Sequence, residues 1–414
     1  MAPRRRTVLA TLAAGTVPLV AGCVDEGDLV YWRDFVLSGA GDVECDGSST
    51  GPADSPSVDV GTGRWPMPGY DQQNTNAAPP GAAPEDCPRV QWHLDPRDPL
   101  DSMGSINRAV VADGRLVHSY QSQILGIDLE RGTIDWEYDQ DGAVGSLAVH
   151  RDTLYSFRNR MIPIDPETGE DGPYHPFGVT AQRSVDPVPI VDGVAYVPFD
   201  GFSLSAVTLE GEPIWSGTVA GAGDADRHAL GNVRRPAIAE GIVYAGSGDA
   251  GLSAFDAATG DEHWADPEAS VGYQPVVGEE YVYVQGRPGL RAYDRHTGEV
   301  AWTALEEENL RYTPALGDDR LFTQAGSTGD MAVIAVDATT GERRWTREIT
   351  RARDQPTVAG DVVLVTDDGS LWAYDVADGS VRWQLSTATH AMRAPAVVDG
   401  TVILQTRQRI YALA

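Results

Sequence analysis

The chain has 414 residues, of which 61 are acidic and 31 basic, so its formal net charge is −30 and its isoelectric point is about 4.4. All basic residues are arginine, and lysine is absent. This charge argues against nucleic acid as a partner, because the phosphate backbone would be repelled. At molar salt the Debye length falls to about 3 Å, so repulsion between distant charges is screened. We therefore expect a halophilic protein that loses folded structure at low salt.

The N-terminus has the features of an export signal. A basic start is followed by an apolar run to Ala21 that is too short to span a bilayer. Arg5-Arg6-x-Val8-Leu9 resembles a twin-arginine signal, and Val20-Ala21-Gly22-Cys23 resembles a lipobox whose Cys23 is lipidated. We expect residues 1–22 to be removed and the protein to be anchored to the outer face of the cytoplasmic membrane. The alternative is an uncleaved anchor or an accidental apolar terminus.

Residues 23–64 are rich in Gly, Ser, Pro and Asp, a composition that predicts a flexible acidic tether. Cys45 lies in this tether, and Cys87 follows it. An exported location permits a disulfide between Cys45 and Cys87, with two unpaired thiols as the alternative. No pair of Cys or His has the spacing of a zinc site, so we expect no metal.

Residues 65–414 contain a repeat. The segments 252–264 and 290–302 are two copies, each with apolar residues at a period of two and an Asp-x-x-Thr-Gly turn before a closing tryptophan. This pattern predicts a β-hairpin. A second hairpin precedes each one, as in residues 275–284. Four strands in roughly 40 residues indicate one blade of a β-propeller.

Two counts predict eight blades. The closing strands contain Trp92, Trp136, Phe177, Trp215, Trp264, Trp302, Trp345 and Trp383. The opening strands begin near Ala109, Leu147, Pro187, Pro236, Pro275, Pro314, Pro356 and Pro395. The final unit lacks its fourth strand, which the N-terminal strand with Trp92 would supply, so that the ring is closed and has no open edge. Seven blades are the alternative if the unit with Phe177 is not a blade.

The pattern Ala-x-Asp-x-x-Thr-Gly-x-x-x-Trp resembles the tryptophan-docking repeat of the pyrroloquinoline quinone (PQQ) type. This repeat is shared by quinoprotein alcohol dehydrogenases and by non-enzymatic scaffold lipoproteins of the BamB type, so the resemblance implies the fold and allows either function. A quinoprotein would need adjacent cysteines, a calcium site and a catalytic Asp. The chain has no adjacent cysteines, and no Asp stands out. We therefore expect no catalytic residue and no cofactor, with PQQ and calcium as the alternative.

Arginines occupy one repeated position just before the opening strands: Arg108, Arg183, Arg234, Arg311, Arg353 and Arg393. Tyr273 and Tyr312 lie at similar offsets. In propellers of this family, such loops resemble those that surround one mouth of the channel. Since Arg offers bidentate donors, the ring is a candidate site for a multiply carboxylated cofactor or for an acidic segment of a partner. The alternative is blade-to-blade ion pairs with carboxylates expected on the same mouth: Asp200, Asp249, Asp330, Asp367 and Asp368.

These observations favour a surface-tethered scaffold that binds or assembles other proteins, with a protein partner at the cell surface. A PQQ-dependent oxidoreductase is the alternative. A module that senses a solute or ligand in the cell envelope is a third possibility.

Overall fold

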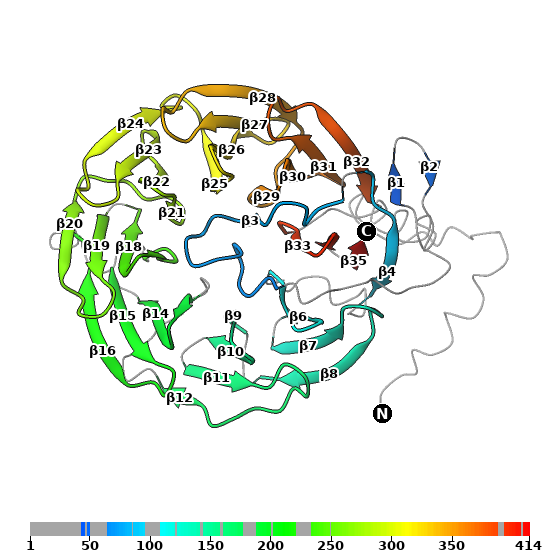
Figure 1. Cartoon of the computed structure of the whole chain (residues 1–414), viewed down its shortest axis with the longest axis horizontal. Helices are drawn as coiled ribbons and strands as arrows, with labels where there is room; N and C mark the ends of the chain where they lie inside the picture. Colours follow the sequence, from blue (N-terminus) through cyan, green and yellow to red (C-terminus); the bar gives the residue numbers. More distant parts are fainter. Residues whose placement is uncertain are drawn as a thin grey trace, which may run out of the picture. The chain divides into compact units, whose positions relative to one another are not determined.

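The computed structural model describes residues 43–45, 48–49, 64–84, 86–95, 108–120, 122–140, 144–157, 160–176, 188–199, 202–220, 233–248, 250–387, 393–406 and 409–414. These residues form a ring of eight blades, each of four antiparallel strands, which is a β-propeller (Figure 1). The prediction of eight blades is confirmed, and seven blades are excluded. No helix of a length and apolarity that would cross a membrane occurs in the described residues.

The first four blades follow the chain in order from the inner to the outer strand. Blade 1 is β5 (Val110–Ala112), β6 (Arg115–Tyr120), β7 (Gln123–Asp128) and β8 (Ile134–Asp139). Blade 2 is β9 (Ser146–His150), β10 (Thr153–Phe157), β11 (Arg160–Ile164) and β12 (His175–Pro176). Blade 3 is β13 (Ile190–Val191), β14 (Val194–Phe199), β15 (Ser203–Thr208) and β16 (Pro213–Thr218). Blade 4 is β17 (Ala237–Ala239), β18 (Ile242–Ser247), β19 (Gly251–Asp256) and β20 (Glu262–Asp266).

The next three blades repeat this order. Blade 5 is β21 (Val276–Val277), β22 (Tyr281–Gly286), β23 (Gly289–Asp294) and β24 (Val300–Ala304). Blade 6 is β25 (Leu310–Leu316), β26 (Arg320–Ser327), β27 (Asp330–Asp337) and β28 (Arg343–Ile349). Blade 7 is β29 (Thr357–Ala359), β30 (Val362–Asp367), β31 (Ser370–Asp375) and β32 (Val381–Thr387).

Blade 8 joins two distant parts of the chain, as the sequence predicts. It contains β33 (Ala396–Val398), β34 (Thr401–Gln405), β35 (Ile410–Leu413) and, as its outer strand, β4 (Val90–Leu94). Trp92 of β4 lies opposite Ala412 of β35, and the backbones of Arg89 and Ala414 exchange hydrogen bonds of 2.8 and 3.0 Å. The ring is therefore closed by antiparallel pairing and leaves no open edge between the first and last blades.

The repeat motif packs each blade against the next. In blade 5, the Asp294 carboxylate accepts the backbone N–H group of Thr297 at 2.8 Å, and Gly298 has a φ of 73°. A Cβ on Gly298 would lie 2.5 Å from the Trp264 ring of blade 4, so glycine is required there. The Trp264 Nε1 donates a hydrogen bond of 2.9 Å to the carbonyl of Arg295. The same packing occurs for Trp92 on Gly132, Trp136 on Gly169, Trp215 on Gly260, Trp302 on Gly341 and Trp345 on Gly379.

Blade 2 has the shortest outer strand, because β12 covers only His175–Pro176. Phe177, proposed as the closing aromatic residue, lies outside the described residues. In other blades a tryptophan ring packs on the glycine of the next turn, but here the Pro176 carbonyl takes that position. A Cβ on Gly211 of blade 3 would lie 2.7 Å from this carbonyl oxygen. The irregular unit is thus a true blade whose described residues contact the next blade through backbone.

Blade 7 carries additional strands on both sides. A hairpin of β1 (Val43–Cys45) and β2 (Ser48–Ser49) pairs antiparallel with the outer strand β32, and β3 (Ala77–Ala78) pairs parallel with the inner strand β29. The hairpin lies in the stretch that we expected to be a tether. Cys45 is opposite Leu385 in its register.

Residues 64–84, which we name the strap, run through the centre of the ring (Figure 1, blue). The strap forms backbone hydrogen bonds of 2.7–3.0 Å with seven of the eight blades, through Trp65, Pro66, Gln72, Gln73, Thr75, Asn76 and Ala82. Their partners are Val111, Val149, Ile238, Val277, Leu316, Val358 and Gly400. These bonds tie the strap to the wall of the channel, so the chain fills the centre of its own ring.

Candidate functional site at the channel mouth

The antiparallel order of the strands places different loops at the two ends of the ring. We call the end at which the inner strands begin the mouth face, and the opposite end, with the Asp-x-x-Thr-Gly turns, the turn face. Arg108, Arg234, Arg353 and Arg393 precede inner strands, and Arg311 is the second residue of an inner strand, so these five belong to the mouth face. Arg183, Asp200 and Asp249 lie outside the described residues.

Asp354 is the centre of a contact between three loops of the mouth face. Its side chain is buried, and its Oδ2 accepts the Arg108 Nε at 3.0 Å while its Oδ1 accepts the Arg108 Nη2. The backbone N–H groups of Gln355 and Ala394 donate to the same carboxylate at 2.9 and 3.1 Å. Burial alone would raise the pKa of Asp354, but Arg108 and then Arg393 bring it below its usual range. The ionised carboxylate thus joins the loops that lead into blades 7, 8 and 1.

Arg393 also interacts electrostatically with the Asp354 carboxylate. Burial is the main cause that lowers the pKa of Arg393; Asp354 opposes this effect, and the like charge of Arg108 adds to it. Two guanidinium groups are therefore held close to one buried carboxylate. These three groups together carry one net positive charge.

Tyr312 occupies a strained position next to this group. Its φ is 61°, in the left-handed region that a bulky residue rarely adopts, and it lies in a bulge of β25. Its hydroxyl donates to the Ala352 carbonyl at 3.2 Å, and its own carbonyl accepts the Gln285 Nε2 at 2.7 Å. Burial is the main cause that raises the pKa of Tyr312, with Asp354 and Tyr273 adding to it. Bonds from neighbouring blades hold the strained residue in place.

The other arginines differ in their partners. Arg353 forms an ion pair with Asp368, and its side chain is 19% exposed. Arg311 is exposed and donates its Nε to the Gly326 carbonyl at 3.3 Å. Arg234 is half-buried, and its Nε has no hydrogen-bond partner among the described residues.

Of the six predicted arginines, Arg108 and Arg393 meet at Asp354, and Arg311 and Arg353 lie near Tyr312. Arg108, Arg353 and Arg393 belong to the loops that lead into blades 1, 7 and 8, and Arg311 is the second residue of β25 in blade 6; we call these four the mouth arc. Ion pairing accounts for Arg108 and Arg353. Binding of an anion by the arc stays a prediction.

The carboxylates expected opposite the arginines have separate tasks. Asp367 accepts the backbone N–H groups of Thr350 and Arg351 at 3.0 and 2.6 Å, so it holds the loop that precedes blade 7. Asp368 pairs with Arg353, and Asp330 is exposed at the start of β27. One of these three aspartates therefore serves as a counter-ion for the arc.

Sequence reasoning missed an arginine that binds the strap. Arg235, beside the predicted Arg234, is buried and donates to the carbonyls of Pro68 and Asp71, the latter at 2.8 Å. Gly69 permits this approach, because a Cβ there would lie 2.7 Å from the Arg235 Nη1. The only signal in the sequence is the Arg234-Arg235 pair, which does not show which arginine faces the centre.

Cys87 is disulfide-bonded. Its Sγ lies 4.0 Å from the carbonyl of Gln384, next to the Leu385 that faces Cys45 in the β1–β32 register. The side chain of Cys45 and all of Cys23 lie outside what the structure describes. The pairing of Cys45 with Cys87 and the lipidation of Cys23 stay predictions.

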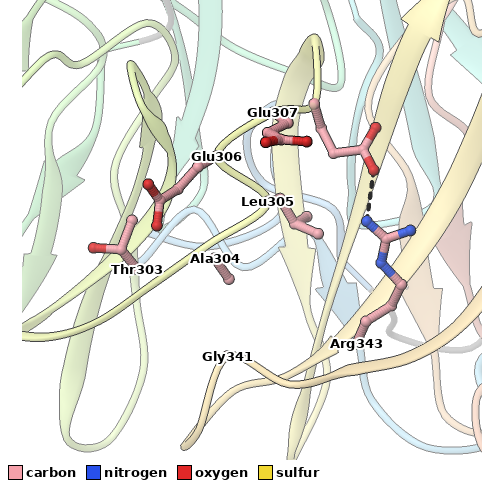
Figure 2. A pocket seen from close by; sticks show the side chains of 8 residues that line it. Thr303, Ala304, Leu305, Glu306, Glu307, Gly341 and Arg343 are labelled. Carbon is pink, nitrogen blue, oxygen red and sulfur yellow. Dashed lines mark hydrogen bonds and ion pairs between the residues drawn. The ribbon is translucent and has the colours of Figure 1, made fainter.

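A hollow of about 610 Å³ lies on the outer side of the ring between β24 and β28. Figure 2 shows Thr303 and Glu306 on one wall and Arg343 on the other. Arg343 forms a 2.5 Å ion pair with Glu308, whereas Glu306 and Glu307 are exposed. Exposed carboxylates are hydrated and interact weakly with ions, so this hollow is a poorer candidate than the mouth.

The described residues contain no group of three or more His, Cys, Asp and Glu that could hold a metal ion. The repeated aspartates are instead used in the turns. Asp256 and Asp337, for example, accept backbone N–H groups at 2.8 Å, and these bonds help to keep the pKa of both carboxyls low.

Comparison with known proteins identifies the family. The family model described as outer membrane protein assembly factor BamB matches residues 88–304 and 289–414. The chain belongs to the BamB family. Among curated proteins, it is 32% identical over 178 residues to the serine/threonine-protein kinase AfsK of Streptomyces griseus and 25% identical over 164 residues to BamB of Bordetella pertussis. These matches cover 38% and 37% of this chain but only 21% and 41% of the relatives.

Solved structures agree with the propeller fold. The quinohemoprotein alcohol dehydrogenase of Comamonas testosteroni has a TM-score of 0.67 at 14% identity, with 84% of this BamB-family chain and 80% of the dehydrogenase covered. BamB of Moraxella catarrhalis has a TM-score of 0.58 at 17% identity, with 79% of this chain and 99% of the other covered. At such identities the likeness shows the fold alone.

Proposed function

We propose that this chain is a non-catalytic scaffold that binds a protein partner through its mouth face, outside the cytoplasmic membrane and tethered there by a lipid on Cys23. Membership of the BamB family supports this proposal, since relatives of that name are outer membrane protein assembly factors. A scaffold acts by holding binding loops in fixed positions, which requires a rigid framework and no reacting group.

The observation that carries the proposal is the strap. Residues 64–84 fill the centre of the ring and are bonded to the inner parts of seven blades. A ring fastened in this way resists deformation, and the loops of its faces remain for recognition. On the mouth face, the buried Asp354 joins the loops of three blades through Arg108 and the backbone of Gln355 and Ala394.

The test is capture of a partner by the full chain in its native membrane. Zero-length crosslinking in molar salt, followed by purification and mass spectrometry, should recover one protein reproducibly. A Cys23→Ser variant tests the anchor, because it should move the protein from the membrane fraction to the soluble fraction. Failure to recover a reproducible partner, or membrane retention of the variant, would contradict the respective part of the proposal.

Titration with PQQ and calcium distinguishes a scaffold from a quinoprotein. The scaffold should show no saturable change in quinone absorbance and no reduction of an artificial electron acceptor by added alcohols. Saturable binding together with acceptor reduction would replace the proposed function by an oxidoreductase.

A further inference from the structure

The junction between blades 7 and 8, which we call the seam, lacks a contact that recurs elsewhere in the ring. At six other junctions a tryptophan ring packs on a glycine of the next blade's turn, and its Nε1 donates to a carbonyl of that turn. In blade 8 the strands β35 and β4 come from distant parts of the chain, so no such turn joins them. Trp383 of blade 7 donates instead to the Pro84 carbonyl, at 3.3 Å. The segment that leads into β4 thus takes the place of the turn.

Cys87 belongs to this segment and lies beside the outer strand of blade 7. It is half-buried and disulfide-bonded, and its Sγ lies 4.0 Å from the Gln384 carbonyl of β32. The added strand β1 pairs with the same part of β32, with Cys45 opposite Leu385. The Cα atoms of antiparallel partners are about 4.5–5.5 Å apart, and those of disulfide partners about 4.4–6.8 Å. The register of β1 therefore brings Cys45 to the part of β32 against which Cys87 lies.

The two strands at the seam have short pairings. β1 forms three residue pairs with β32 of blade 7, and β4 forms four with β35 of blade 8. Short pairings at the edge of a sheet open more readily than the strands of a core. Cys45 and Cys87 are 42 positions apart, so a long loop connects the two strands along the chain. A disulfide shortens that connection to a few atoms, and each strand then holds the other near its own partner.

We propose that Cys45 and Cys87 form a redox-sensitive clasp that locks the seam, by joining the strand added to blade 7 to the strand that completes blade 8. To close the clasp, the two thiols lose two protons and two electrons to the disulfide of a thiol oxidoreductase, which is reduced to a dithiol. Disulfides of this kind persist outside the reducing cytoplasm, so the clasp is open in the newly made chain and closes after export. The inference shares with the proposed function only this location and does not depend on the partner.

Mass spectrometry of the full chain, isolated from its native membrane without reductant, tests the crosslink. Cleavage at arginine gives the peptides 34–64 and 65–89, which contain Cys45 and Cys87. These two peptides should stay joined until a phosphine reductant is added. Free thiols at both positions would overturn the clasp, as would a crosslink of Cys87 to Cys23 or to a second chain.

Amide hydrogen exchange of the full chain in molar potassium chloride, with and without the reductant, tests what the clasp does. Reduction should accelerate exchange in β1 and β4 by at least about tenfold, because each strand then opens independently of the other. The strand β19 in blade 4, on the opposite side of the ring, should keep its rate (Figure 1). Equal exchange of β1 and β4 in the oxidised and reduced protein would overturn the inference.

Serine variants assign the effect to the two cysteines. Cys45→Ser and Cys87→Ser should each show the fast exchange of the reduced wild type and no response to the reductant. Cys23→Ser is the matched control, because it also removes a cysteine and should keep the wild-type response. A response to the reductant that persists in Cys45→Ser would overturn the pairing. The comparison of oxidised with reduced wild type needs no variant, so it holds even if a variant does not fold.

The outcomes separate this inference from the proposed function. A crosslink of Cys87 to Cys23 would overturn the clasp and also the lipid anchor, because the same sulfur cannot carry both. A seam that exchanges equally in both redox states would overturn the clasp alone. A confirmed clasp in a protein that captures no partner would overturn the proposed scaffold and leave this inference standing.

Discussion

The two faces of the ring use charge in different ways. On the turn face, several charged partners are close in sequence: Arg344 pairs with Asp337 at 2.6 Å, seven positions away, and the turn aspartates accept backbone N–H groups of their own turns. Arg295 is an exception, because it pairs with Glu240 of the preceding blade at 2.7 Å. On the mouth face, Arg108 reaches Asp354 across 246 positions. The contacts of the turn face recur from blade to blade and stabilise each turn. The contact of Arg108 with Asp354 on the mouth face occurs once and joins different loops. The contacts of the mouth face do not recur in every blade, so this face is the better place to look for a function specific to this protein.

The largest expected effect is that of removing the Asp354 charge. Asp354→Asn leaves Arg108 and Arg393 without their buried counter-ion, and breaking a buried ion pair from one side costs about 3–5 kcal/mol. Asp361→Asn on the turn face is the control, since Asp361 is 69% exposed beside Arg382 and its loss should cost about 0–1 kcal/mol. Urea unfolding at constant molar salt measures both. If both variants lost the same free energy of unfolding, the ion pairs of the two faces would not differ in their contribution to stability.

Within the turn face, the contact of glycine with tryptophan should outweigh backbone strain. Gly298→Ala places a Cβ against the Trp264 ring and keeps a φ of 73°, so a loss of about 2–4 kcal/mol is expected. Gly193→Ala has a similar φ of 82° but nothing within 4 Å, so it should cost about 1 kcal/mol. Thermal and urea unfolding compare them. A similar cost for both would mean that strain alone requires glycine.

Two buried glutamines test how blades near the mouth are joined. Gln285 donates to the Tyr312 carbonyl and accepts from the Thr323 hydroxyl, both at 2.7 Å, so Gln285→Met should cost about 1–3 kcal/mol. Gln324 is equally buried, and neither atom of its amide has a partner among the described residues. Gln324→Met should therefore leave the free energy of unfolding unchanged or increase it. A loss at Gln324 as large as that at Gln285 would show that its amide is bonded in solution.

The smallest expected effects concern how the stability of the fold depends on pH. The hydrogen bond from Arg344 is the main cause that lowers the pKa of Asp337, to about 2 from 3.8, so this group stabilises the fold at neutral pH and loses that contribution as the pH falls from about 4 to about 2. Burial raises the pKa of Asp71 in the strap, so its protonation favours the folded state as the pH falls. Asp337→Asn should thus destabilise at neutral pH and not at pH 2.

Asp71→Asn should have the opposite sign, with a gain or no loss at neutral pH that disappears in acid. Melting temperatures of both variants and the wild type between pH 2 and pH 7, at constant salt, measure the two differences. Parallel pH profiles for the two variants would contradict the assignment of opposite pKa shifts to turn and strap.

The sequence predicts the eight blades and their closure because the repeat has a physical period: alternating apolar residues, a turn that needs glycine and a tryptophan that needs a neighbour. It also singles out six arginines at one repeated position, of which Arg108 and Arg393 lie beside Asp354. It does not reveal Asp354 as their counter-ion, because that contact joins loops far apart in the chain. The strap was missed for another reason: it is held by backbone hydrogen bonds, which any residue type can form, and by the buried side chains of Asn74 and Asn76, which belong to no repeat.

The position of the strap has a consequence for folding of the newly synthesised chain. The strap and β4 leave the ribosome before any blade is complete, yet their partners extend to the far end of the chain, where Ala412 pairs with Trp92. Early segments must therefore wait for late ones, and the many contacts between distant residues make folding slow. A chain of this kind matures only after its synthesis, in whichever compartment it then occupies. Export in the folded state, which Arg5 and Arg6 predict, would allow that wait to take place inside the cell.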